Sequence, residues 1–143
     1  MTLENIQSKL DMLRENLERL EQIPQASFEE FAGDFRNVDS AQHRLQTSIQ
    51  ALINVGSFLL ALLGLPAPRT SREILERLEE GGHVPPGTVE RFGPIFGFRN
   101  RIVHLYDRVD SRIVYRILRE NRTDLADLMT VMLDVAARAT EGS

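Results

Sequence analysis

The chain has 143 residues, of which 42% are hydrophobic and 27% are charged, so it is long enough to bury one core and is expected to form a single domain over residues 1–143. It contains no cysteine, which excludes disulfide bonds and thiolate metal sites and fits a reducing cytoplasm. The formal net charge of −4 excludes a uniformly basic surface, so that any site for a polyanion must be local.

The first third of the chain has the hydrophobic periodicity of helices. Apolar residues recur every three or four positions from residue 3, which predicts an amphipathic helix that ends before Pro24. Ser27, followed by Glu30 three residues later, predicts a capped short helix, and Gly33 is expected to interrupt or bend it. A long helix is then expected from about Val38 to Leu63. Its last turns are apolar on most faces, so they should be deeply buried or lie in a subunit interface.

The rest of the chain is divided by glycine and proline. Ser71 begins a short helix, Thr88 is a candidate N-cap of the next helix, and Asp110 or Ser111 starts the last section. The predicted breaks are Gly64–Pro68, Gly81–Gly82, Pro85–Gly87 and a junction at Asn121–Thr123. No repeat or strand pattern is evident, and the whole predicts an all-α, up-and-down bundle of about five to six helices.

Signals for a membrane or for secretion are weak. The first residues lack the basic and apolar regions of a signal peptide. The longest apolar run, Phe58 to Leu65, is far shorter than the ~20 residues needed to cross a bilayer. We therefore expect a cytoplasmic protein that does not associate with membranes.

The most informative segment, residues 99–106, reads Arg-Asn-Arg-Ile-Val-His-Leu-Tyr. In a helix, Arg99 and Tyr106 would project within roughly 20° of each other, and Asn100 and His104 about 40° apart. The four polar groups would therefore share one broad arc. Arginine binds phosphate oxygens and histidine transfers protons near neutral pH, so this face suits phosphate chemistry.

Metal-free RNA cleavage is one reaction that these groups suit. It needs a base for the ribose 2′-hydroxyl, an acid for the leaving 5′-oxygen and a cation for the charge that develops on phosphorus. His104 can serve as base or acid, Arg99 can supply the cation, and Asn100 can orient the imidazole or donate to phosphate. Because this segment has a single histidine whereas the reaction uses both a base and an acid, two copies about a twofold axis would supply both.

The basic residues are concentrated around this segment. Residues 91–122 hold eight arginines and three acidic residues, a local charge of +5. An arginine-rich strip is typical of a nucleic-acid footprint, because the planar guanidinium matches phosphate. The alternative is that some of these arginines, in particular Arg116, Arg119 and Arg122, only solvate helix faces or pair with Asp and Glu.

The pattern Arg-Asn-x-x-x-His-x-Tyr resembles the Arg-x4-His-x-Tyr signature of the HEPN superfamily, specifically HepT-like toxins that are paired with MNT-type nucleotidyltransferase antitoxins. The flanks are also similar to this family. They are Gly97-Phe98 before the motif, Val109-Asp110 and Ile113-Val114-Tyr115 after it, and the segment from Arg44-Leu45-Gln46 through Ile49-Gln50-Ala51 to Leu59. The resemblance covers nearly the whole chain, most strongly residues 40–135.

The resemblance implies a homodimeric endoribonuclease with its cleft at the dimer interface. Arg99 and His104 would be the catalytic pair, and cleavage would need no metal or other cofactor and leave a 2′,3′-cyclic phosphate. Tyr106 would be the residue to which the antitoxin transfers AMP, which would block RNA by charge and bulk. Asn100, Arg101 and Arg108 are candidates for supporting RNA binding.

Other readings of these residues remain open. In the long helix the family often has an Asp followed four residues later by a His, where this chain has Asn54 and Phe58, so support for nuclease activity is weaker here. One alternative is a non-catalytic helical subunit that binds a nucleotide or phosphate and partners a nucleotidyltransferase. Another is that the histidine is structural, that Arg99 is an ion-pair partner and that Tyr106 only packs. No zinc site can be assembled, since the histidines lack ligand spacing.

Overall fold

The computed structural model describes residues 3–102 and 109–141, with only the backbone described at Leu3, Glu4 and Asn100. Within these ranges the chain forms six helices and no strand, which confirms the predicted all-α class. The helices are α1 (Leu3–Gln22), α2 (Phe28–Ala32), α3 (Phe35–Leu62), α4 (Ser71–Glu80), α5 (Thr88–Ile102) and α6 (Ser111–Glu141).

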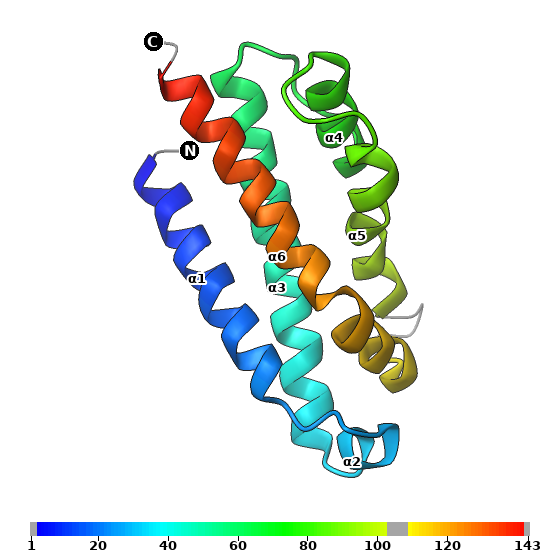
Figure 1. The fold of residues 1–143 in the computed structure, drawn as a ribbon. Coiled ribbons are helices and arrows are strands. Elements are labelled where there is room, and N and C mark those ends of the chain that lie inside the picture. The colour runs from blue at the N-terminus through cyan, green and yellow to red at the C-terminus, as the bar shows by residue number, and fades with distance from the viewer. Residues whose placement is uncertain (1–2, 103–108, 142–143) are drawn as a thin grey trace.

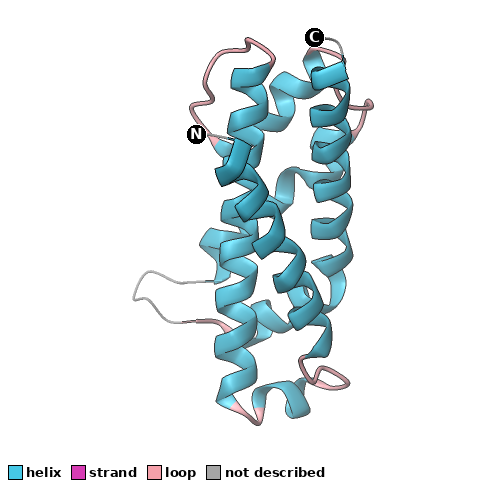
Figure 2. Cartoon of the chain, turned by 90° about the vertical axis from the view of Figure 1, so that its left-hand side faces the viewer, coloured by secondary structure: helices cyan, strands magenta, loops and turns pink. Residues whose placement is uncertain are grey.

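The helices form an up-and-down bundle around α3. In Figure 1, α1 and α5 run in one direction and α3 and α6 in the other, while α2 closes one end and α4 precedes α5 at the opposite end. α3 packs against all five other helices, and α6 packs against α1, α2, α3 and α5. The first turn of α1 and the last turn of α6 lie at the same end of the bundle, as Figures 1 and 2 show. The core therefore surrounds α3.

The long apolar helix is a core helix. Leu45, Ile49, Leu52 and Leu60 are completely buried, but Leu62 in the last turn is 44% exposed, so the apolar end of α3 is only partly internal. By length and composition alone α3 would also pass as a membrane-spanning helix, but half of its most apolar window is buried inside the bundle. A globular core therefore accounts for its hydrophobicity.

Side-chain caps set several helix ends, and the cap at Ser27 was predicted from the sequence. The Ser27 hydroxyl accepts the Glu30 N–H at 3.1 Å, and α2 follows directly. At α4, the Glu73 carboxylate accepts the backbone N–H of Arg69 at 2.6 Å, which lowers the pKa of that carboxyl from its usual value. The Asp34 carboxylate accepts the Arg36 N–H at 2.9 Å, and α3 consequently begins three residues before the predicted start at Val38.

Two predicted local features are wrong. Thr88 does not cap α5 with its side chain, because its hydroxyl donates to the Pro85 carbonyl at 2.6 Å. The N–H of Val89 is instead accepted by the Glu79 carboxylate of α4 at 2.9 Å, a tertiary cap that local sequence does not reveal. The junction predicted at Asn121–Thr123 is also absent, since α6 runs through it without a break. Leu118 and Leu125, on either side of it, are both buried, so packing on the core holds this stretch helical.

Two helical glycines offer a matched test of packing. A Cβ added at Gly56 in α3 would lie 2.6 Å from Ile74 Cγ2 and 3.3 Å from Met132 Cε, whereas one added at Gly97 in α5 would meet nothing within 4 Å. We expect Gly56→Val to lower the free energy of unfolding by about 1–3 kcal/mol through overpacking. Gly97→Ala should raise it by about 0.5–1 kcal/mol, because alanine favours the helix. Urea unfolding at one fixed protein concentration measures both, and the reverse order would contradict this packing.

Candidate active site

The described part of the predicted site lies in the last turn of α5. Arg99 and Arg101 are exposed there, whereas Phe98 and Ile102 are buried in the core. The alternation follows from the helical period, since residues three and four apart share a face. The side chain of Asn100 and the whole of residues 103–108, which include His104, Tyr106 and Arg108, lie outside the described residues.

Arg99 is held against the central helix by a neutral hydrogen-bond chain. Its Nη1 donates to Gln50 Oε1 on α3, and Gln50 Nε2 donates in turn to Asn54 Oδ1 at 3.0 Å. The two amides are four residues apart and therefore adjacent on one face of α3. Gln50 thus uses its oxygen for Arg99 and its nitrogen for Asn54, which fixes the orientation of its amide.

Among the described residues, Arg99 has a neutral hydrogen-bond partner and no acidic one. No carboxylate lies within ion-pair distance of Arg99 among the described residues, which argues against a simple structural ion pair within that part of the chain. The hydrogen bond to Gln50 uses one of the five N–H donors of a guanidinium. The group is therefore both positioned and able to bind a phosphate in the bidentate manner that arginine favours.

Gln50 is the residue of this site that the motif does not reveal. It lies 49 positions from Arg99, and no local spacing links the two. Asn54 stands out in the sequence only as a departure from the family pattern. Gln50 and Asn54 form an i, i+4 polar pair, but α3 contains other polar pairs at this spacing, such as Gln42 and Gln46, so the pattern does not single them out.

The start of α6 is tied to the end of α5. The Asp110 N–H donates to the Ile102 carbonyl at 3.1 Å. The Asp110 carboxylate accepts the N–H groups of Arg112 and Ile113 at 3.0 and 3.2 Å, so this residue caps α6 as predicted. This connection brings the arginine-rich first turns of α6 next to the end of α5 that carries Arg99.

The predicted arginine strip is only partly available for a ligand. Arg91 pairs with Asp127 at 2.5 Å and with Asp124 at 3.6 Å, so its role is to join α5 to α6. Arg101 lies 5.7 Å from the centre of the Phe98 ring and remains exposed. Arg122 donates to the Gln25 side-chain oxygen at 3.2 Å. Within the described ranges, no group of three His, Asp or Glu side chains is arranged to hold a metal ion.

The fold and the site together define a small all-α bundle in which an exposed arginine, fixed on the central helix by an amide pair, borders a basic surface. A model of the family described as ribonuclease HepT-like matches residues 13–132 of this chain. The chain belongs to the ribonuclease HepT-like family.

Individual relatives agree with this assignment. The chain is similar to the tRNA nuclease HepT of Aphanizomenon flos-aquae, with 26% identity over 110 residues that cover 77% of this chain and 75% of the relative. Its fold is similar to the tri-AMPylated HEPN toxin of Shewanella oneidensis, solved in complex with an MNT antitoxin, with a TM-score of 0.77, 22% identity, and coverage of 93% and 98%. A toxin–antitoxin structure with AMP-PNP matches with a TM-score of 0.76, 21% identity, and coverage of 92% and 99%.

Proposed function

We propose that this protein is a metal-independent endoribonuclease toxin whose active cleft forms between two copies of the chain. The observation that carries the proposal is the family match over residues 13–132, which includes the whole segment 99–106. The name of its relative, a tRNA nuclease, supports an RNA substrate. We expect the protein to act in the cytoplasm, where an RNA substrate and a nucleotidyltransferase partner would both be present.

The proposed roles follow from the chemistry of the residues. Arg99, held by Gln50 and without a carboxylate partner in the described chain, binds the scissile phosphate and stabilises the charge that develops on it. His104 transfers the protons, with one copy from each protomer serving as base and acid. Asn100, Arg101 and Arg108 contribute to RNA binding, and the exposure of Arg101 supports its part in this.

The proposed partner is an MNT-type nucleotidyltransferase antitoxin that transfers AMP to Tyr106. The solved HEPN toxin of similar fold is tri-AMPylated and in complex with an MNT antitoxin, which supports this pairing. An adenylate on Tyr106 would add negative charge and bulk seven residues from Arg99 along the chain. Both effects oppose the binding of an RNA phosphate.

Cleavage in the absence of divalent metal tests the proposed function. The purified, unmodified chain is incubated with total tRNA in EDTA, and the ends of the products are analysed. We expect cleavage at an undiminished rate, because proton transfer and charge stabilisation come from side chains, and we expect 2′,3′-cyclic phosphate ends. A requirement for Mg²⁺, or products with 5′-phosphate and 3′-hydroxyl ends, would contradict the mechanism. Light scattering should give twice the mass of the chain.

The second candidate function is a non-catalytic subunit that binds a nucleotide or phosphate next to a nucleotidyltransferase. It is favoured by Phe58, which occupies the position where the family often has a histidine. Under this hypothesis, Arg99 and Asn100 hold the phosphate and no cleavage follows. A purified dimer that binds AMP tightly but leaves tRNA intact at every pH between 5 and 9 would establish it in place of the toxin.

A further inference from the structure

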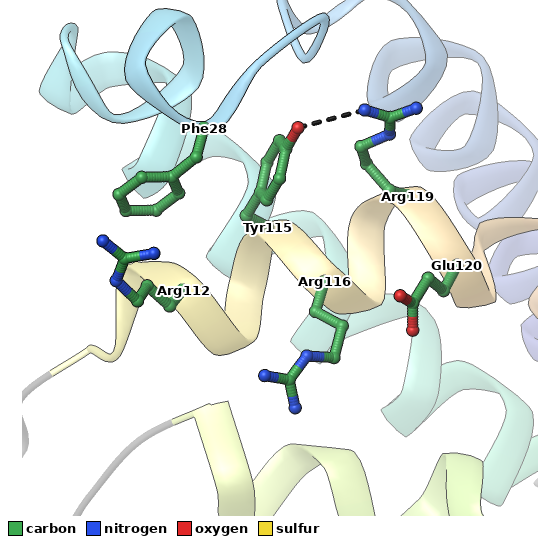
Figure 3. Close-up of a pocket in the computed structure, with 6 residues that line it drawn as sticks. All are labelled: Phe28, Arg112, Tyr115, Arg116, Arg119 and Glu120. Atoms are coloured by element: carbon green, nitrogen blue, oxygen red, sulfur yellow. Dashed lines mark hydrogen bonds between the residues drawn. The ribbon is translucent and has the colours of Figure 1, made fainter.

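A second basic site lies beside α2, on the first three turns of α6. It is a cavity of about 410 Å³ that does not include Arg99. Figure 3 shows the side chains that line it. They are Phe28, Arg112, Tyr115, Arg116, Arg119 and Glu120. We refer to this cavity as the α6 pocket.

Helical spacing brings the basic residues of the α6 pocket together. Arg112, Tyr115, Arg116 and Arg119 occupy positions i, i+3, i+4 and i+7 of α6, which lie on one face of a helix. In Figure 3, Phe28, Tyr115 and Arg119 lie along one edge of the α6 ribbon, and Arg116 and Glu120 project from the other. Among the described residues that line the pocket, three guanidinium groups therefore accompany one carboxylate, that of Glu120.

Arg112, Arg116 and Arg119 form no ion pair with a carboxylate among the residues that the structure describes. Arg112 lies over the Phe28 ring at 4.2 Å from its centre, and Arg119 donates to the Tyr115 hydroxyl at 3.1 Å. Arg116 is exposed and has no carboxylate partner in the part of the chain that the structure describes. By contrast, the surface arginines Arg14 and Arg138 pair with Asp11 and Asp134 at 3.4 and 3.0 Å. Uncompensated like charges held close together favour an anionic ligand.

The wall of the pocket also suits a planar base. The Phe28 and Tyr115 rings meet edge to face, with centres 5.6 Å apart and an angle of 73° between their planes. The Tyr115 hydroxyl is close to the Gln25 carbonyl, with an oxygen–oxygen distance of 3.4 Å, and the ring is half-buried. The guanidinium of Arg112, already stacked on Phe28, offers a second flat surface. Stacking of bases on aromatic and guanidinium planes is a common mode of single-strand recognition.

We propose that the α6 pocket binds a nucleotide of single-stranded RNA that lies outside the scissile phosphate. Arg116 and Arg119 contact the phosphodiester backbone, and a base stacks against the Arg112–Phe28 pair. Glu120 lies at the edge of the pocket, where its carboxylate accepts from a base amino group. The hydrogen bond between Asp110 and Ile102 places the pocket close to the end of α5 that carries Arg99. The inference rests on the proposed function, because it gives the RNA substrate a second binding site.

A binding experiment with charge-matched variants tests this inference. All proteins in this experiment also carry the substitutions His104→Ala and Tyr106→Phe, so that RNA is not cut and no adenylate is attached. Binding to a fluorescent 12-nucleotide single-stranded RNA is followed by anisotropy at several salt concentrations. The pocket variant is Arg116→Gln/Arg119→Gln. The control, Arg14→Gln/Arg19→Gln, removes the same charge from exposed positions on α1.

We expect the pocket variant to bind RNA at least about tenfold more weakly, and its salt slope to fall by about 1.4, or about 0.7 for each phosphate that an arginine no longer neutralises. The control should bind within about twofold of the parent. Double-stranded RNA of the same sequence should be affected less than the single strand, because paired bases cannot stack in the pocket. In the active chain, the pocket variant should raise KM with little change in kcat.

The outcomes separate this inference from the proposed function. If the pocket variant and the control bind RNA equally while the active chain cleaves tRNA, the α6 pocket is not an RNA site and the toxin proposal stands. If the parent cleaves no RNA yet its binding depends on Arg116 and Arg119, the pocket stands as an RNA site and the nuclease proposal falls. Loss of helical circular dichroism in the pocket variant is checked first, and Arg116→Gln alone then repeats the test.

Discussion

Replacing His104 with alanine is expected to reduce cleavage of tRNA by at least about a thousandfold, and replacing Arg99 with alanine by about a hundred- to a thousandfold. The first change removes the proposed proton-transfer group from both halves of the proposed dimeric cleft, and general acid–base catalysis contributes about 10² to 10⁴ in rate for each group. The second removes the guanidinium that Gln50 presents, and a single electrostatic contact to the transition state is worth about 10² to 10³. Initial rates under single-turnover conditions measure both.

Three further variants show whether these losses are specific. Arg101→Ala removes an exposed arginine two residues from Arg99 and should reduce cleavage less than about tenfold, mainly through KM. Gln50→Leu removes the group that positions Arg99, and should lower kcat by about tenfold with no change in the thermal unfolding midpoint. Gln50→Glu keeps an acceptor for Arg99 but adds a negative charge beside it, so it should weaken phosphate binding and raise KM.

A His104→Ala chain that is folded and cleaves tRNA like the parent would contradict the proposed mechanism.

Co-expression with the proposed nucleotidyltransferase partner is expected to convert the chain into a form that is heavier by whole adenylate units and that does not cleave tRNA. The phosphate of the first adenylate would compete for Arg99, the arginine that we propose binds RNA, and its bulk would fill the proposed cleft. The intact mass of the purified chain measures the modification, and the tRNA assay measures its effect. Cleavage should fall at least about a hundredfold in the fully modified protein.

The chain contains a matched control for the modified residue. It has two tyrosines, and Tyr115 is half-buried on α6 with its hydroxyl close to Arg119 and the Gln25 carbonyl. Tyr106→Phe should abolish the mass increment, whereas Tyr115→Phe should keep it. An adenylate that remains on the Tyr106→Phe chain, or an increment that disappears only in Tyr115→Phe, would place the acceptor elsewhere and overturn the assignment.

The extent to which the site was predictable differs from residue to residue. Arg99 was identifiable from its motif, because its polar neighbours recur at helical spacing. Gln50 was not, since it lies on another helix and is joined to Arg99 only when α3 and α5 pack. The α6 pocket was visible only as a charge excess, and the sequence could not separate Arg91, which is ion-paired, from Arg116, which has no described acidic partner.

The helix boundaries also differ in how far the sequence could predict them. Ser27 and Asp110 were recognisable as caps because a cap bonds to N–H groups two or three residues away, within the reach of a sequence pattern. The polar stretch at Asn121–Thr123 was predicted to be a junction, but α6 passes through it because Leu118 and Leu125 on either side are buried in the bundle. Tertiary packing outweighed a weak local preference.

The sequence by itself determined the helical class of this protein, the positions of most helix ends and the segment that we propose to carry its chemistry. All of these depend on interactions between residues near one another in the chain. Only the tertiary structure decided which arginines have an acidic partner within the described chain, which amide orients Arg99 and how α2 and α6 enclose a pocket. Those properties depend on distances between residues far apart in the chain, which are set when the helices pack around α3.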